Sequence, residues 1–167
     1  LRYGRAMAFT ESEIEYLDNQ PLGRLATAQP DGTLQVSPVT FSYNRELGTI
    51  DISGYNLTAS RKFRNLVSNP RVAFVVDDLP SISPWRVRCL EIRGWAEPLD
   101  ELAVPLIRIH PERIISFGID EPNTPAHQLT TNNRDVEATP SAGGFPYREG
   151  HRSDCPCIFE GVAIMSA

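Results

Sequence analysis

The residues of this chain best suited to bind an anion are Ser60, Arg61 and Lys62, which stand together in that order. The chain has fifteen arginines and a single lysine, and that lysine is Lys62. A serine and two cations at the first turn of a helix favour phosphate, because free backbone N–H groups, the helix dipole and the side-chain charges converge there. A merely solvated helix face that also includes Arg64 is equally compatible with these residues.

The flanking sequence predicts the elements that would position this triplet. An apolar strand pattern at residues 49–53 leads into a turn at residues 54–56, and the triplet then opens a short helix. Asn69-Pro70 is predicted to end the helix, because a proline disfavours helical backbone at the residue before it. A second strand is predicted directly afterwards, at residues 72–76.

Composition sets limits on the class of protein. The 167 residues, 41% hydrophobic and 22% charged, suffice for one ordinary core. A net charge of -5 makes nucleic acid a poor general partner, because binding to phosphate backbones needs a broad basic surface. No apolar run is long enough to span a membrane and no signal-peptide core is evident. We therefore expect a soluble, cytoplasmic protein that binds neither nucleic acid nor membrane.

The N-terminal third predicts a helix followed by strands. Residues 1–8 lack any period and are interpreted as a loose arm or an expression remnant. Thr10 and Glu13 form a capping box at the start of a short helix. Strands are predicted at residues 22–28 and 34–41, and Pro38 requires an edge, bulge or break in the second because it cannot donate to a ladder. Such a break would free backbone groups for a ligand.

The middle of the chain predicts further strands. Asp77 and Asp78 follow a strand and precede a proline, which favours a turn or cap over a catalytic carboxylate pair. The longest strand pattern covers residues 86–97, and another is expected at residues 106–119 with an interruption at residues 110–111. About six strands and two short helices favour a mainly β fold, a closed or partly closed antiparallel barrel. We place this domain at residues 9–120 and expect residues 121–167 to form an irregular extension.

Other candidate residues have structural interpretations. Cys89 alternates with apolar residues and is expected to be a core thiol, and Trp85 and Trp95 to be core or interface aromatics. The C-terminal Cys155 and Cys157 could bind a metal together with a nearby histidine and aspartate, but their spacing does not match that of zinc knuckles, so no metal is expected.

Several ordered stretches resemble one family. They are Leu22-Gly23-Arg24-Leu25-Ala26-Thr27, Asp31-Gly32, Ser37-Pro38-Val39-Thr40-Phe41, Ser60-Arg61-Lys62-Phe63-Arg64-Asn65, Asn69-Pro70-Arg71-Val72-Ala73, Pro84-Trp85, Ile92-Arg93-Gly94 and residues 110–118. Together these resemble the split-barrel flavin-binding proteins related to pyridoxamine 5'-phosphate oxidase. Within that superfamily the similarity is to the actinobacterial branch that uses the deazaflavin coenzyme F420.

The resemblance implies a six-stranded split β-barrel that forms a homodimer with two cofactor sites at the subunit interface. It implies that Arg61 and Lys62 hold the cofactor phosphate and that Ser60 hydrogen-bonds it. Arg64 and Arg86 could contact the anionic oligoglutamate tail of F420. The other residues it implies for the cofactor site are Ser37, Pro38 and Val39 beside the ring, Ser53 and Gly54 bordering it, and Trp85 and Arg88 from the other subunit.

The implied function is an oxidoreductase that uses F420 for hydride transfer to or from a small organic substrate. The catalytic residue is unknown, because the cofactor performs the chemistry and the protein positions it. Two features of the true pyridoxamine phosphate oxidases are missing, a phosphate-binding arginine on the second strand and a C-terminal arginine–histidine motif, so oxidation of vitamin B6 is not expected. FMN in place of F420, a non-catalytic binder of flavin, deazaflavin or haem, and a dimeric scaffold with a vestigial phosphate site remain alternatives.

Overall fold

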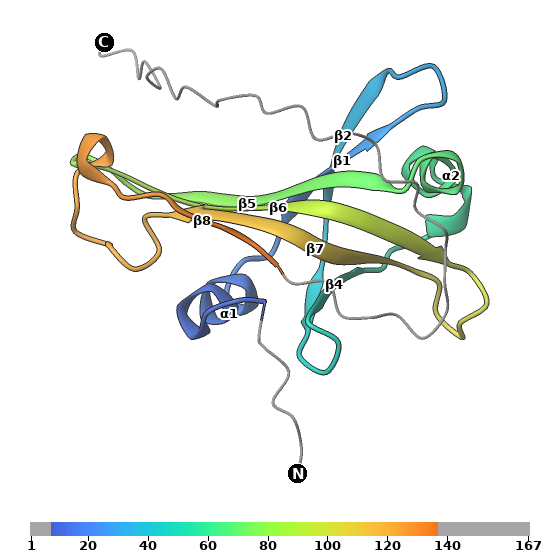
Figure 1. Ribbon diagram of the computed structural model, residues 1–167, viewed down its shortest axis with the longest axis horizontal. Coiled ribbons are helices and arrows are strands. Elements are labelled where there is room, and N and C mark those ends of the chain that lie inside the picture. The colour runs from blue at the N-terminus through green and yellow to red at the C-terminus, as the bar shows by residue number, and fades with distance from the viewer. Residues whose placement is uncertain (1–7, 137–167) are drawn as a thin grey trace.

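The computed structural model describes residues 8–136 of the chain (Figure 1). Its first element is helix α1, Glu11–Asp18, which the predicted capping box begins. The Thr10 hydroxyl accepts a hydrogen bond from the Glu13 N–H at 3.3 Å, and the Glu13 carboxylate accepts one from the Thr10 N–H at 3.0 Å. Ile14 and Leu17 face the core, so the helix packs by its apolar side.

Eight strands follow in one antiparallel sheet. They are β1 (Gly23–Ala28), β2 (Leu34–Val39), β3 (Ser42–Asn44), β4 (Thr49–Ile52), β5 (Arg71–Ile82), β6 (Trp85–Leu99), β7 (Leu106–Phe117) and β8 (Asn132–Asp135). Their order is β2-β1-β5-β6-β7-β4-β3, and β8 also pairs with β7. Residues that are fully buried alternate along the strands, as Ile50 and Ile52 do on β4, and this alternation defines the inner face.

The two ends of this strand order meet through the chain itself. Only Thr40 and Phe41 separate β2 from β3, so the sheet must curl until its two outermost strands approach one another. No ladder joins β2 to β3 within residues 8–136, and the barrel is therefore open along this line. The mainly β, antiparallel split-barrel prediction is confirmed, but the sheet has eight strands instead of the six expected. The strand predicted at residues 34–41 ends at Val39, and the short β3, which was not predicted, begins at Ser42.

The β5–β6 hairpin is longer than the sequence indicates. The strand expected at residues 72–76 continues to Ile82, so the turn or cap predicted for Asp77 and Asp78 is wrong. Both aspartates lie on β5, where Asp78 stands opposite Arg88 of β6 and Asp77 contacts Arg24 of β1. Cross-strand cations neutralise these carboxylates, so local turn preference does not decide their structure.

β7 runs without the expected interruption at residues 110–111. A bulge in the pairing with β6 absorbs the irregularity, since Gly94 pairs with Pro111 and the adjacent Arg93 pairs with Arg113. A Cβ at Gly94 would lie 2.0 Å from the backbone oxygen of His110. Glycine therefore permits the close approach that lets β7 continue.

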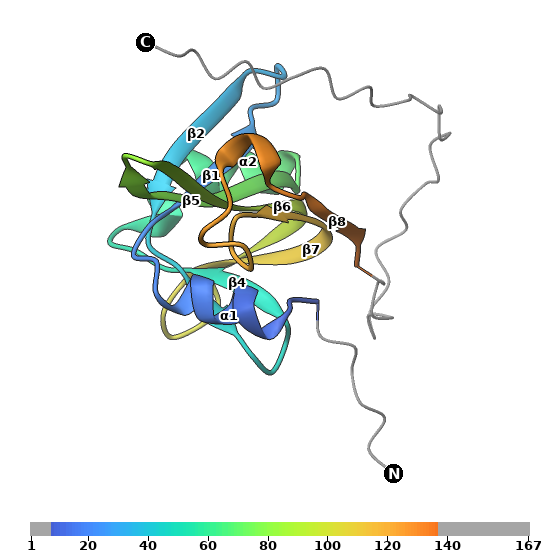
Figure 2. The ribbon, with the colours of Figure 1, turned by 90° about the vertical axis from the view of Figure 1, so that its left-hand side faces the viewer.

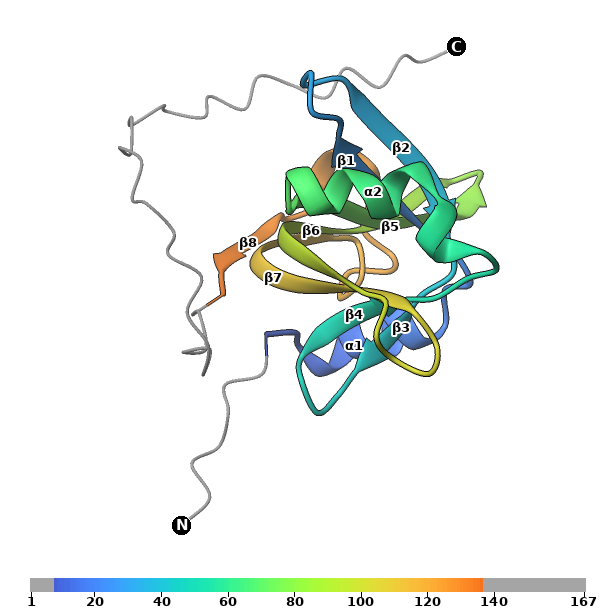
Figure 3. The same ribbon diagram turned by 90° about the vertical axis from the view of Figure 1, so that its right-hand side faces the viewer.

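Two helical segments lie between β4 and β5, and Figure 3 shows the longer one lying across β1 and β6. A 3₁₀-helix, η1 (Leu57–Ala59), leads into α2 (Arg61–Ser68), which places Phe63 and Leu66 in the core. Val67 on the same helix is exposed although its side chain is apolar. Among the helices of residues 8–136, none has the length and apolar character needed to cross a membrane.

Part of the segment expected to be irregular is regular. Residues 121–136 contain the 3₁₀-helix η2 (Ala126–Gln128) and β8, visible in orange in Figure 2. Arg134 of β8 binds the buried Glu13 carboxylate, which also accepts from the Ser116 hydroxyl at 2.7 Å. The remainder of the predicted extension and the predicted N-terminal arm lie outside the described residues, apart from Ala8, and the domain boundary stays a prediction.

Candidate functional site

The N-terminus of α2 carries the residues from which the sequence predicted a phosphate site. Ser60 is the N-cap, and its Oγ accepts from the Phe63 N–H at 3.3 Å. The backbone N–H groups of Arg61 and Lys62 have no acceptor within the described part of the chain. First-turn N–H groups in this state attract anions. The Ser60 hydroxyl already caps the helix, and its contact with phosphate stays a prediction.

Three cations surround this helix end, and their environments differ. Arg61 donates from Nη1 to the Gln29 side-chain oxygen at 2.9 Å, and Arg64 donates from Nη1 to the Ala59 carbonyl at 2.8 Å. Lys62 is half-buried, and its ammonium group has no hydrogen bond or ion pair to any residue among 8–136. Lys62 is therefore the cation of the predicted triplet that is free to bind a ligand.

A chain of polar side chains fixes α2 against the first two strands. The buried Asn65 donates from Nδ2 to Thr27 Oγ1 at 3.0 Å and to Gln35 Oε1 at 3.2 Å. Gln35 in turn donates from Nε2 to Ser37 Oγ at 3.4 Å. These hydrogen bonds place the predicted site residues of α2 and of β2 at the same end of the molecule. Sequence reasoning missed Asn65 and Gln35, although the helical spacing of Asn65 from Lys62 and the alternation of Gln35 with Ser37 were available signals.

The predicted ring-binding segments lie next to each other. Ser37 and Val39 share the inner face of β2 with Gln35, whereas Pro38 lies on the exposed face. β2 has no partner strand on the side away from β1 among the described residues, so its free backbone groups face outward. Thr40 Oγ1 contacts the Ser53 carbonyl at 3.5 Å, which joins the end of β2 to the end of β4.

Gly54 follows Ser53 and provides open space at this point. A Cβ added at Gly54 would meet no atom within 4 Å, and Ser53 and Gly54 are both exposed. The structure thus brings together the predicted residues of α2, β2 and the end of β4. Their roles in binding a cofactor stay predictions.

Trp85 and Arg88 lie far from this group. Arg71 closely follows the C-terminal end of α2 and pairs with Trp95, whereas Trp85 begins β6 ten residues earlier, so roughly 30 Å of extended strand separates Trp85 from that end of the helix. Figure 1 shows α2 at one end of β5 and β6 and the orange segment of residues 118–131 at the other. Within one chain neither residue reaches α2, and their contribution to a partner subunit's site stays a prediction.

The Arg88 guanidinium is already engaged. It binds the Asp78 carboxylate through two hydrogen bonds, 2.9 Å from Nε and 2.6 Å from Nη2, and Tyr16 of α1 donates to the same carboxylate at 3.0 Å. The hydrogen bonds from Arg88 hold the pKa of Asp78 below its usual value, and burial raises that of Tyr16. This network joins α1 to the β5–β6 hairpin, so in this chain Arg88 has a structural role.

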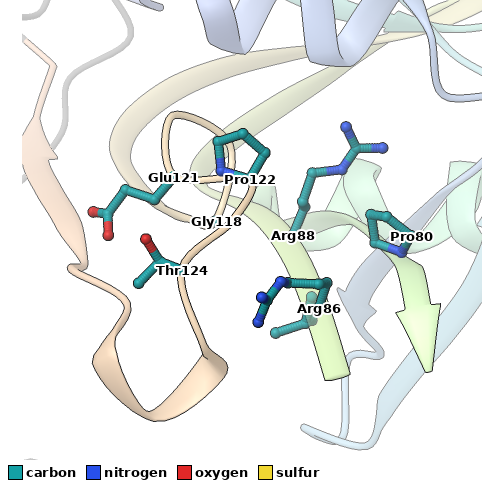
Figure 4. Close-up of a pocket in the computed structure, with 8 residues that line it drawn as sticks. Pro80, Arg86, Arg88, Gly118, Glu121, Pro122 and Thr124 are labelled. Atoms are coloured by element: carbon teal, nitrogen blue, oxygen red, sulfur yellow. The ribbon is translucent and has the colours of Figure 1, made fainter. Parts of the chain in front are cut away.

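A small hollow of about 70 Å³ lies beside this network. The loop after β7, with Glu121 and Thr124, forms one wall, and Arg86 and Arg88 of β6 form the other. Figure 4 shows Arg86 extending toward the loop and Arg88 extending away from it. The hollow is remote from α2 and does not contribute to the group described above.

An ion pair and a thiol lie elsewhere in the sheet. Arg108 of β7 donates two hydrogen bonds, each 2.8 Å long, to the carboxylate of Asp51 on β4. Burial raises the pKa of Asp51, but the hydrogen bonds from Arg108 and Asn44 outweigh burial and lower it. Cys89 is half-buried and does not belong to the core, so the prediction of a core thiol is wrong. Burial still raises the pKa of its thiol to about 12, which fits an inert thiol.

Metal ligation has no support in the described region. Between residues 8 and 136 no three His, Cys, Asp or Glu side chains lie close enough together to hold a metal ion. The C-terminal candidates, His151, Asp154, Cys155 and Cys157, lie outside the described residues.

Comparison with known proteins identifies the family of this chain. Residues 9–118 match the family described as pyridoxamine 5'-phosphate oxidase. The chain belongs to this family. A relative from Streptomyces rimosus subsp. rimosus, named 5a,11a-dehydrotetracycline/5a,11a-dehydrooxytetracycline reductase, is 46% identical over 122 residues, which cover 68% of this chain and 86% of the relative. Both the family and this relative are named as oxidoreductases.

Two solved structures share the fold of this chain. A conserved hypothetical protein from Mycobacterium tuberculosis aligns with a TM-score of 0.57 at 20% identity, covering 83% of this chain and 99% of that one. A FAD-binding protein from Mesorhizobium loti aligns with a TM-score of 0.51 at 20% identity, covering 65% of this chain and 93% of that one. At these identities the likeness concerns the split-barrel fold alone.

Proposed function

We propose that this protein is a reductase that binds the deazaflavin coenzyme F420 at the first turn of α2 and reduces an unsaturated organic substrate. Oxidoreductase is the class of activity that family membership supports. The observation that carries the proposal is Lys62, a half-buried residue whose ammonium group has no partner in the described part of the chain and which lies beside two free backbone N–H groups.

The residues present fit such a cofactor. Lys62 and the α2 N-terminus would hold the phosphate, while the exposed Arg61 and Arg64 would attract the anionic oligoglutamate tail of F420. The free edge of β2 and the open space at Gly54 would accommodate the flat ring. When bound, the deazaflavin supplies two-electron redox chemistry by hydride transfer, and the protein binds and orients it.

The substrate class follows from the relative. Its name describes a reductase of dehydro compounds, which contain two hydrogens fewer than the tetracyclines after which they are named. We therefore propose a conjugated, unsaturated substrate, as the chemistry of a hydride donor also favours. We further propose a homodimer, because Trp85 and Arg88 can approach an α2 site only on another copy of the chain.

The test is a binding titration of the purified full chain with F420 and with FMN, followed by fluorescence. The Lys62→Ala variant should bind F420 about 10- to 100-fold more weakly, the loss of one charge-assisted hydrogen bond. Arg45→Ala is the matched control, because Arg45 is an exposed cation that pairs with Asp18 and lies away from α2.

The outcomes separate the candidate functions. Tight F420 binding that Lys62→Ala weakens and Arg45→Ala does not, together with consumption of reduced F420 by an unsaturated substrate, would support the proposal. Binding of FMN alone would assign flavin chemistry to the same site. Equal affinity of wild type and Lys62→Ala would show that the α2 N-terminus does not hold the phosphate.

A further inference from the structure

The side chain of Gln35 has a fixed orientation that no predicted role explains. Its Oε1 accepts from Asn65 Nδ2 at 3.2 Å, which places its Nε2 on the opposite side, toward Ser37. An amide nitrogen carries two N–H groups, and the contact with Ser37 Oγ, at 3.4 Å, can use one of them. The second N–H has no acceptor among residues 8–136, and the side chain is only half-buried.

Asn65 determines this orientation. Asn65 is only 4% exposed, and its Nδ2 donates to both Thr27 and Gln35. Because these two acceptors hold the Asn65 amide, the Gln35 amide cannot turn over without losing its bond to α2. A buried amide that uses both N–H groups in this way acts as a template for its neighbour.

Gln35 lies between the predicted phosphate-binding end of α2 and the predicted ring-binding residues of β2. Along the inner face of β2, Gln35 precedes Ser37 by one repeat, about 7 Å. On α2, Lys62 and Asn65 are three residues apart and therefore neighbours, about 5–6 Å between their Cβ atoms. A molecule whose phosphate lies at Lys62 and whose ring lies along residues 37–39 would pass the free N–H of Gln35.

We propose that Gln35 donates a hydrogen bond to a carbonyl oxygen of the cofactor ring and that Asn65 is the positioning residue that presents it. The assignment rests on the proposed function. The free group is an uncharged donor, so its partner is an acceptor such as the carbonyl oxygens of the pyrimidine part of a flavin or deazaflavin ring. The contact is independent of the phosphate, which Lys62 holds.

Matched ligands with and without phosphate separate these two contacts. The probes are FMN with riboflavin, and F420 with its deazariboflavin part, which lacks the phosphate and the tail attached to it. Gln35→Leu removes the donor at similar volume and should weaken both members of a pair by the same factor, roughly three- to tenfold. Lys62→Ala should weaken only the phosphate-bearing member. Gln128→Ala, an exposed glutamine on η2, is the control that should change neither.

Asn65→Asp tests whether Asn65 positions Gln35, because it replaces only the NH₂ group of the Asn65 amide with an oxygen. An ionised carboxylate only accepts, so Thr27 would donate its hydroxyl to the introduced carboxylate, and Gln35 would turn its Nε2 toward that same group. The Gln35 oxygen would then face the ring carbonyl, and binding should weaken as much as in Gln35→Leu. In a Gln35→Leu background Asn65→Asp should cause no further loss of affinity. Thermal unfolding of each variant checks that α2 remains packed.

The results distinguish this inference from the proposed function. If Lys62→Ala spares the phosphate-bearing ligands, or wild type binds none of the four, the proposed function fails and the inference fails with it. If Lys62→Ala behaves as expected while Gln35→Leu changes affinity less than twofold, only the inference is overturned. A Gln35→Leu loss confined to the phosphate-bearing ligands, or additive losses for Asn65→Asp and Gln35→Leu, would also overturn it.

Discussion

Replacing Arg134 with methionine tests whether a buried ion pair fastens β8 to α1. The Glu13 side chain is 1% exposed and that of Arg134 is 27% exposed. Arg134 donates to both carboxylate oxygens of Glu13 and, at 2.9 Å, to the carbonyl of Ala8. Removing one partner of a buried pair costs about 3–5 kcal/mol, because the other charge stays buried.

The structure places the expected cost at the lower end of that range. The Thr10 N–H and the Ser116 hydroxyl would still donate to Glu13, and the partial exposure of Arg134 would let water approach. We expect Arg134→Met to lower the free energy of unfolding by about 3 kcal/mol. For a chain of this size, that loss lowers the melting temperature by about 6–12 °C.

Urea unfolding of the full chain measures this cost in a double-mutant cycle with Glu13→Gln. Once residue 13 is neutral, Arg134→Met should cost at least about 1.5 kcal/mol less, which is the coupling between the two side chains. Arg113→Met is the matched control, because Arg113 pairs with Asp135 on the same ladder but that aspartate is 80% exposed. Exposed pairs contribute about 1 kcal/mol or less. Equal costs for the two arginines, or additive costs in the cycle, would refute the argument.

Two other perturbations follow from the structure. Burial raises the pKa of Glu13, but hydrogen bonds from Arg134 and others outweigh burial and lower it below 4.5. The stability that Glu13 contributes is therefore fully present above that pH and is lost as the pH falls toward the folded-state pKa. Between pH 7 and pH 3 the melting temperature should fall less steeply in Glu13→Gln than in wild type, and parallel curves would contradict this. Gly23→Ala should cost about 1–3 kcal/mol in urea unfolding, because its Cβ would lie 2.1 Å from Cζ of Phe74. Gly54→Ala, with nothing within 4 Å, should leave stability unchanged, and similar losses in both variants would show that the clash is not the cause.

The elements that sequence predicted well depend on neighbours in the chain. The capping box of Thr10 and Glu13, the N-cap Ser60 and the end of α2 at Asn69 each involve residues three or four positions apart. The apolar alternation of β4 likewise requires only its own residues. Such local signals survive without any knowledge of which segments pair.

The predictions that failed concern contacts between distant segments. β8 forms because β7 offers free backbone groups and the buried Glu13 requires a cation, and neither condition is visible in residues 132–135. Asp78 belongs to a strand because Arg88 stands opposite. The continuity of β7 at Pro111 depends on Gly94, which belongs to another strand.

The sequence by itself determined the helix that begins after Ser60, with Lys62 in its first turn, because helix start signals and helical spacing are local properties. Only the tertiary structure decided that Asn65 and Gln35 join this helix to β2. The tertiary structure also decided that roughly 30 Å of extended strand separates Trp85 from the C-terminal end of α2. Strand register is set by pairing between segments far apart in the chain, so residue spacing alone could not reveal either relation.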